Sequence, residues 1–176
     1  MTDSGSHKRK LLIIINGKGG VGKDTLCDFA AARYRVRNVS SITPIKEIAA
    51  ANGWTGEKTP EARRFLADLK EAFTRYNDLP TRYLLEQYRQ FLDSDEELMF
   101  AHIREAGEIA KLKSRVDGPC VTLLVRRGSQ VPAAWGNAAD DETEKYAYDY
   151  IYENCFPLEE AKKDFLAFLE EKVIGR

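Results

Sequence analysis

The sequence predicts an α/β fold, a three-layer α/β/α sandwich whose parallel sheet has five strands. The residues from Leu11 to Ile15 form an unbroken apolar run, typical of a strand buried on both faces of a parallel sheet. Further strand-like segments begin near residues 36, 98, 120 and 149, and helical patterns separate them. The 176 residues are therefore expected to form a single domain, 1–176, large enough for a proper hydrophobic core.

A glycine-rich loop follows the first apolar run. Gly17, Gly22 and Lys23 satisfy the pattern G-x-x-x-x-G-K between a strand and a helix. Glycines allow the positive φ angles that turn backbone N–H groups inward, and the helix start adds free N–H groups and a positive dipole end. Lys23 would place its ammonium on the β- and γ-phosphates of ATP. The expected nucleotide-binding loop comprises Gly17, Lys18, Gly19, Gly20, Val21, Gly22, Lys23, Asp24 and Thr25.

The residue after the lysine departs from this pattern. Asp24 stands where a magnesium-ligating Ser or Thr is usual, and Thr25 comes one place later. Carboxylate oxygens suit a hard cation, so we expect Asp24 and Thr25 to bind Mg²⁺ and to contact the α- and β-phosphates. Without a metal the carboxylate would repel the phosphates, so nucleotide binding should depend strongly on magnesium.

Other interpretations of the loop remain open. It could be an ordinary glycine-rich turn, or a dinucleotide site, because Gly17, Gly19 and Gly22 also spell G-x-G-x-x-G. A dinucleotide site needs an acid at the end of the second strand, and the expected strand 36–42 has none there. The letters K-G-G-V-G-K, from Lys18 to Lys23, are those of ParA/MinD-type ATPases, which continue with Thr or Ser and usually have longer chains.

The spelling G-K-D-T, from Gly22 to Thr25, resembles the P-loop nucleotide and metabolite kinases typified by deoxynucleoside monophosphate kinases, with dephospho-CoA kinase and phosphomevalonate kinase nearby. The stretch 148–154 and the following Leu-Glu-Glu resemble their last strand and helix, where an asparagine corresponding to Asn154 lies beside the adenine. The resemblance implies the sheet order 2-3-1-4-5. It also implies phosphoryl transfer from magnesium-ATP to a small phosphorylated acceptor, above all a (deoxy)nucleoside monophosphate.

In such kinases a helical module between the second and third strands binds the acceptor. Residues 57–93 match that position, with an N-cap at Thr59 and apolar residues at helical spacing. Arginine suits phosphate because its planar fork makes two parallel hydrogen bonds. We therefore expect Arg64 and Arg75 to reach the acceptor. Lys46, just after the second strand, is either a further acceptor contact or a solvated helix lysine.

The third strand is expected to end with His102, Ile103 and Arg104, where similar kinases have Asp-Val-Arg. Arg104 matches their arginine and is assigned a catalytic role. We interpret His102 as a half-buried histidine that pairs with its neighbours, because a lone histidine has many structural uses. The acid of the family pattern is then missing, and Glu105 is the nearest carboxylate that could act on the metal through its water shell.

The fourth strand is expected to end in Arg126 and Arg127, followed by small, loop-like residues. The resemblance makes 126–142 a lid over ATP, whose arginines stabilise charge on the moving phosphoryl group. We expect Arg126 and Arg127 to be catalytic. Residues 1–9 are expected to be a disordered lead-in.

Composition limits the function classes. The net charge of −1 provides no general basic surface for nucleic acid, and no run approaches the 18 apolar residues of a membrane span. The scattered Cys27, Cys120 and Cys155 are typical of reduced thiols in a cytoplasmic protein. The expected partner is a small-molecule phosphate acceptor, and a homodimer is compatible with the sequence. Two alternatives to a kinase are a non-catalytic nucleotide sensor and a ParA/MinD-like regulatory ATPase.

Overall fold

The computed structural model describes residues 10–128 and 142–175. The lead-in expected at 1–9 and residues 129–141 of the expected lid lie outside the described residues. The described elements, in chain order, are β1 (Leu11–Asn16), α1 (Lys23–Ala31), β2 (Val36–Ser40), α2 (Thr43–Ala51), α3 (Pro60–Asn77), α4 (Leu79–Asp93), β3 (Leu98–His102), α5 (Ala106–Arg115), β4 (Cys120–Arg126), η2 (Glu142–Lys145), β5 (Tyr150–Glu153), α7 (Leu158–Phe168) and η3 (Leu169–Ile174).

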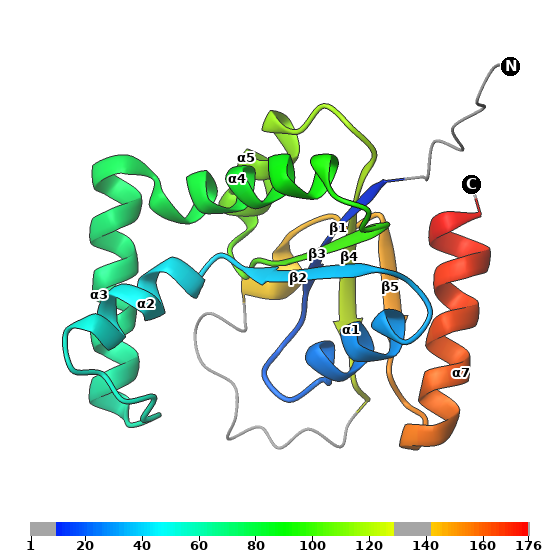
Figure 1. The fold of residues 1–176 in the computed structure, drawn as a ribbon. Coiled ribbons are helices and arrows are strands. Elements are labelled where there is room, and N and C mark those ends of the chain that lie inside the picture. Colours follow the sequence, from blue (N-terminus) through cyan, green and yellow to red (C-terminus); the bar gives the residue numbers. More distant parts are fainter. Residues whose placement is uncertain (1–9, 129–141, 176) are drawn as a thin grey trace, which may run out of the picture.

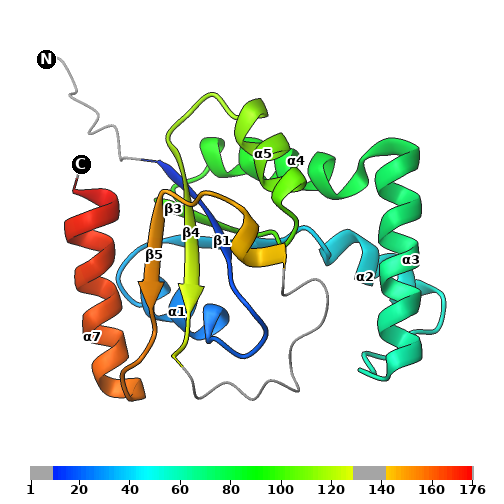
Figure 2. The ribbon, with the colours of Figure 1, turned by 180° about the vertical axis from the view of Figure 1, so that it is seen from behind.

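The strands form a five-stranded parallel sheet in the order β2-β3-β1-β4-β5 (Figures 1 and 2). This confirms the predicted fold class and strand order. Strand β1 is central, with Ile13 opposite Phe100 of β3 and Val121 of β4. All six residues of β1 are buried, because helices cover both faces of the sheet.

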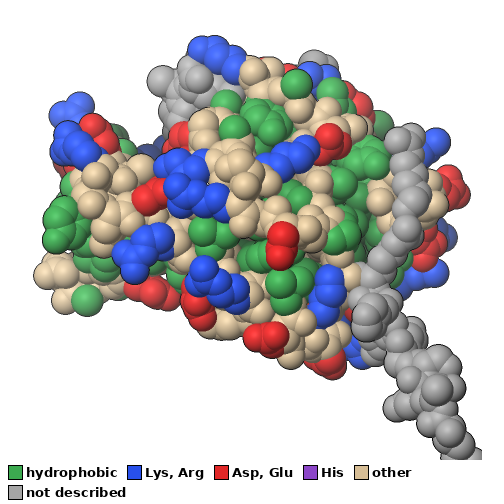
Figure 3. Space-filling view, turned by 90° about the horizontal axis from the view of Figure 1, so that it is seen from above, with side chains coloured by type: hydrophobic (Ala, Val, Ile, Leu, Met, Phe, Trp, Pro, Cys, Tyr) green, Lys and Arg blue, Asp and Glu red, His purple; other side chains and the backbone are tan. Residues whose placement is uncertain are grey.

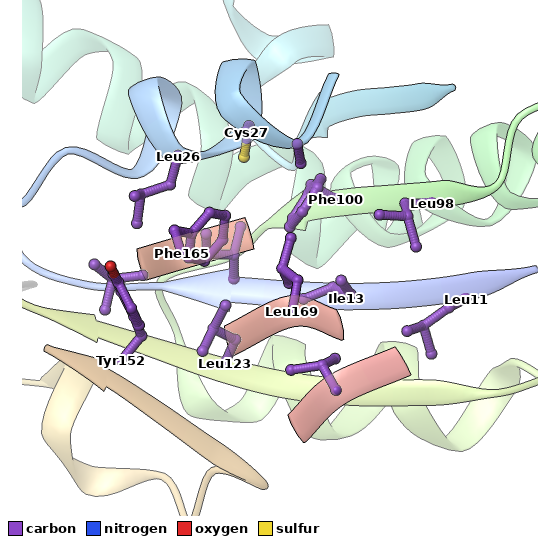
Figure 4. Close-up of a cluster of buried hydrophobic side chains, with 14 of the residues drawn as sticks. Leu11, Ile13, Leu26, Cys27, Leu98, Phe100, Leu123, Tyr152, Phe165 and Leu169 are labelled. Atoms are coloured by element: carbon purple, nitrogen blue, oxygen red, sulfur yellow. The ribbon is translucent and has the colours of Figure 1, made fainter. Parts of the chain in front are cut away.

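Alternate residues of β1 enter two separate hydrophobic clusters, because side chains alternate across a strand. Leu11, Ile13 and Ile15 pack with residues of α1 and α7, such as Leu26 and Phe165 (Figure 4). Leu12 and Ile14 pack on the opposite face with residues of α4 and α5, which include Phe91 and Leu112. Full burial of one such side chain contributes about 1.5–3 kcal/mol. The two clusters form the hydrophobic core between the sheet and the helices on each of its faces, as the predicted three-layer sandwich requires.

The outer face over α4 and α5 carries charged side chains of both signs together with hydrophobic ones. Figure 3 shows lysine, arginine and acidic side chains interspersed there with hydrophobic ones, in keeping with a net charge of −1. In the part of the chain that the structure describes, no helix is long and apolar enough to span a bilayer.

Two local expectations were wrong. Strand β2 ends at Ser40 rather than Ile42, because the Ser41 N–H bonds to the carbonyl of His102 and the chain then turns into α2. The spacing of apolar residues in the last helix predicts Leu158 on its buried face, but the Leu158 side chain is 64% exposed. It lies in the first turn of α7, and burial begins further along the helix, at Ala161, Phe165 and Leu169.

Residues 57–93, expected to be helical, form α3 and α4. Figures 1 and 2 show α3 standing at the side of the molecule away from α7, where it contacts α2 and α4. Its start is capped as predicted, because the Thr59 hydroxyl accepts a hydrogen bond from the Ala62 N–H at 3.2 Å. Ala62 is the buried residue of α3, and Phe65 is 42% exposed. We refer to α2 and α3 as the helical arm.

Candidate functional site

The carboxyl ends of the five parallel strands lie at one edge of the sheet. Helices α1, α2 and α5 begin just beyond β1, β2 and β3 at this edge (Figure 1). In open parallel sheets this edge is where ligands bind, since loops and helix N-termini converge there. The glycine-rich loop and the third-strand ending are therefore brought together as predicted.

Two glycines of the loop cannot be replaced without strain. A Cβ on Gly17 would lie 2.5 Å from the carbonyl oxygen of Val125 in β4. Gly22 has φ +91° and forms the N-cap of α1 with no side-chain hydrogen bond to the helix. Gly22 therefore supplies no side chain that would compete with an anion for the first-turn N–H groups of α1. This is the backbone geometry that a phosphate loop requires.

Lys23 bends back over the loop. Its ammonium donates to the carbonyl oxygens of Gly17 at 2.6 Å and Lys18 at 3.1 Å. The positive charge is thus held at the mouth of the loop, next to the start of α1. An ammonium and helix N–H groups on one small surface form a strong site for a polyphosphate.

Asn16 ties the loop to its surroundings. Its Oδ1 accepts the Gly17 N–H at 2.8 Å, and its Nδ2 donates to the Arg104 carbonyl at 3.0 Å and to the Tyr148 hydroxyl at 2.8 Å. The residue is 1% exposed. This role of Asn16 was not predicted, although a polar residue that ends a fully apolar strand was the available signal.

Asn154 holds the loop from the other side. Its Nδ2 donates to the Val21 carbonyl at 2.8 Å, and its backbone N–H donates to the Arg126 carbonyl at 2.7 Å. The structure therefore places Asn154 at the loop. Its predicted contact with adenine stays a prediction.

Asp24 and Thr25 lie in the first turn of α1. The Asp24 side chain is 93% exposed, and Thr25 is half-buried. Among the described residues, no cluster of three or more His, Cys, Asp or Glu could hold a metal. Magnesium is commonly held by one or two protein oxygens together with phosphates and waters. A single exposed carboxylate beside a phosphate loop fits that donor set.

His102 is the inward residue at the end of β3. Its side chain is 14% exposed, and its Nε2 lies 2.8 Å from Asn38 Oδ1 and 3.7 Å from Cys27 Sγ. Burial lowers the pKa of His102 to about 4, since the opposing effect of Asp24 is smaller and Lys23 lowers the value further. The imidazole is therefore neutral at pH 7. This confirms the interpretation of His102 as a half-buried histidine paired with its neighbours.

Glu105 pairs with the helical arm. Its Oε1 lies 2.7 Å from Lys70 Nζ of α3, and Glu108 Oε2 lies 3.1 Å from the same ammonium. Burial has the largest single effect on the pKa of Glu105 and raises it, but Lys70 together with hydrogen bonds from Glu108 and the backbone lowers the pKa overall. Burial raises the pKa of Glu108. The metal role of Glu105 stays a prediction, and a metal would compete with Lys70 for this carboxylate.

The predicted catalytic arginines lie at strand ends. Arg126 ends β4, and its guanidinium forms an ion pair with Glu144 of η2, Nη2 to Oε2 at 2.6 Å. Glu153 of β5 lies 3.7 Å from the same guanidinium. Arg127 and Arg104 are exposed just beyond β4 and β3. Bound phosphates would compete with Glu144 for Arg126.

The predicted acceptor residues are exposed on the helical arm. Lys46 lies in the first turn of α2, near the carboxyl edge of the sheet, and Arg64 and Arg75 lie on α3. At a rise of 1.5 Å per residue, Arg64 and Arg75 share a face of α3 but lie about 16 Å apart along its axis. A single phosphate group can therefore be bound by Arg64 or by Arg75, but not by both.

Comparison with solved structures supports the fold. A sugar kinase from Janibacter sp. matches with a TM-score of 0.54 at 13% identity, covering 93% of this chain and 96% of that one. Shikimate kinase from Aquifex aeolicus matches with a TM-score of 0.54 at 17% identity, over 94% of this chain and 99% of the enzyme. A protein from Thermus thermophilus matches with a TM-score of 0.53 at 18% identity, over 94% and 100% of the two chains.

No protein-family model matches the sequence, and no curated protein matches it. At these identities the structural likeness shows the fold. The chain thus shares its fold with these two structures along nearly its whole length.

Proposed function

We propose that this protein is a kinase that transfers the γ-phosphoryl group of magnesium-ATP to a small acceptor. The observation that carries the proposal is the loop between β1 and α1, where the glycine-capped start of the helix and the Lys23 ammonium, held by the Gly17 and Lys18 carbonyls, lie together. Its place at the carboxyl edge of a parallel sheet, in a fold shared with structures named as kinases, supports the same function.

The residues at the carboxyl edge of the sheet have different roles in the proposed reaction. Lys23 and the loop N–H groups hold the β- and γ-phosphates. Asp24 and Thr25 would hold magnesium, which neutralises charge on the phosphates. Arg104, Arg126 and Arg127 would stabilise the charge that develops during transfer, because preorganised cations act strongly in a site from which water is excluded.

We propose a (deoxy)nucleoside monophosphate as the acceptor. The G-K-D-T letters and the basic residues Lys46, Arg64 and Arg75 on the helical arm support a phosphorylated molecule. A hydroxyl acceptor without phosphate is the second candidate, because two structural neighbours are named as a sugar kinase and a shikimate kinase.

A coupled ADP-release screen tests the proposal. Magnesium-ATP is supplied with nucleoside and deoxynucleoside monophosphates, dephospho-CoA, phosphorylated alcohols, sugars and shikimate in turn. We expect ADP release that one acceptor class stimulates and that Lys23→Ala abolishes, whereas Lys172→Ala, which changes an exposed lysine of η3, leaves it unchanged. ATP binding without transfer to any acceptor would identify a sensor, and acceptor-independent hydrolysis would identify an ATPase. Either result would overturn the kinase proposal.

A further inference from the structure

His102 lies where three elements meet. It ends β3, and its ring points towards α1, so that its Nε2 lies near side chains of both β2 and α1. Asn38 Oδ1 of β2 is 2.8 Å away, and from α1 Cys27 Sγ is 3.7 Å and Asp24 Oδ1 is 4.0 Å away. A group with this placement connects the sheet edge to the first turn of the helix that carries the phosphate loop.

The surroundings determine which ring nitrogen carries the proton. Two lone-pair acceptors do not approach to 2.8 Å, so the contact with Asn38 Oδ1 requires a proton on Nε2. Asp24 Oδ1 is also an acceptor and lies 4.0 Å from the same nitrogen. The Nε2–H group therefore has two acceptor oxygens within 4.0 Å, one from β2 and one from α1, in addition to the Cys27 sulfur at 3.7 Å.

The Asp24 carboxylate takes up one fixed orientation only if a neighbouring group holds it. Its side chain is 93% exposed, and an exposed side chain samples several rotamers. A separation of 4.0 Å from His102 Nε2 is longer than a hydrogen bond, and a small change of the Asp24 rotamer would close it. A donor behind a metal-binding carboxylate orients that ligand and strengthens metal binding.

We propose that His102 is a positioning residue for magnesium: its Nε2–H group holds one oxygen of Asp24 while the other oxygen binds the ion. The inference rests on the proposed function, since it takes magnesium-nucleotide as the ligand of the loop. It assigns a role to the histidine that stands where similar kinases have an acid. Asn38 Oδ1, at 2.8 Å, is the competing acceptor for the same N–H group.

Calorimetric titration of ATP at a series of magnesium concentrations tests this role without relying on turnover. His102→Phe keeps an aromatic ring but removes the donor, so half-maximal ATP binding should need at least about tenfold more magnesium. His102→Gln restores an N–H donor and should bring that requirement back to within about threefold of the wild type. Asn38→Ala removes the competing acceptor and should require no more magnesium than the wild type.

The thermal midpoint of each variant in EDTA reports whether it is folded. An unchanged magnesium requirement in His102→Phe would overturn the inference. So would an equal loss in His102→Gln or in Asn38→Ala, because both results would mean that the histidine acts only through packing. A wild-type protein that fails to bind ATP even at saturating magnesium would instead refute the proposed function.

Discussion

The strand that carries the phosphate loop and the helical arm are built in opposite ways. All six residues of β1 are buried between two layers, whereas in α3, which has 18 residues, Ala62 is the buried one. Segments with few buried contacts open at low free-energy cost, and binding segments are commonly of this kind. The difference indicates a rigid strand beneath the proposed nucleotide site and, beside it, an arm that opens more readily.

The largest expected contrast is between core truncations in the two regions. Ile13→Ala removes a fully buried side chain from the middle of β1 and should lower the free energy of unfolding by about 4 kcal/mol. Phe65→Ala on α3 truncates a side chain that is 42% exposed and should cost about 1 kcal/mol. Urea unfolding measures the free energy of unfolding of both variants. Equal losses would contradict the difference in burial between β1 and α3.

A pair of glycine variants tests the rigidity of the loop. Gly17→Ala places a Cβ 2.5 Å from the Val125 carbonyl oxygen and should cost about 3 kcal/mol from overlap and backbone strain. Gly53→Ala, after α2, also has a positive φ but meets nothing within 4 Å, so about 1 kcal/mol is expected. Chemical denaturation gives both values. A Gly17→Ala loss no larger than that of Gly53→Ala would contradict the close packing of the loop.

The pH dependence of stability should report the burial of His102 at the nucleotide site. The pKa of His102 is lowered from 6.5 to about 4, so below pH 6.5 the unfolded chain binds a proton that the folded protein does not. Stability is therefore full above pH 6.5 and falls as the pH drops towards 4, by about 3 kcal/mol from this group. Metal-free His102→Gln should lose less stability over that range, and an identical pH profile would refute the assignment.

A smaller stability effect than those of Ile13→Ala and Gly17→Ala is expected at the contact between α3 and α5. Lys70→Met leaves Glu105 and Glu108 without their shared ammonium and should destabilise the protein by about 2 kcal/mol at pH 7. Because burial raises the pKa of Glu108, part of this loss should be relieved at acidic pH, where that carboxyl is protonated. Thermal unfolding at the two pH values measures the relief. A loss independent of pH would mean that Lys70 contributes through packing alone.

Local patterns in the sequence were enough for the sheet and the loop. The apolar run before Asn16 and the glycine spacing from Gly17 to Gly22 each reflect a requirement within a few residues, and the strand order followed from the resemblance. Contacts between distant residues could not be predicted. The Lys70–Glu105 pair joins α3 to the start of α5, and Arg126 is paired with Glu144. Charge spacing in the sequence does not encode which exposed groups meet.

Calorimetric titration of magnesium-ATP into the wild type, Lys23→Ala and Lys172→Ala tests most directly whether the loop is a triphosphate site. We expect saturable, magnesium-dependent binding to the wild type and to Lys172→Ala. Lys23→Ala should bind at least about tenfold more weakly, because it lacks the ammonium at the mouth of the loop. Equal affinity in all three proteins, or no binding to the wild type, would contradict the account.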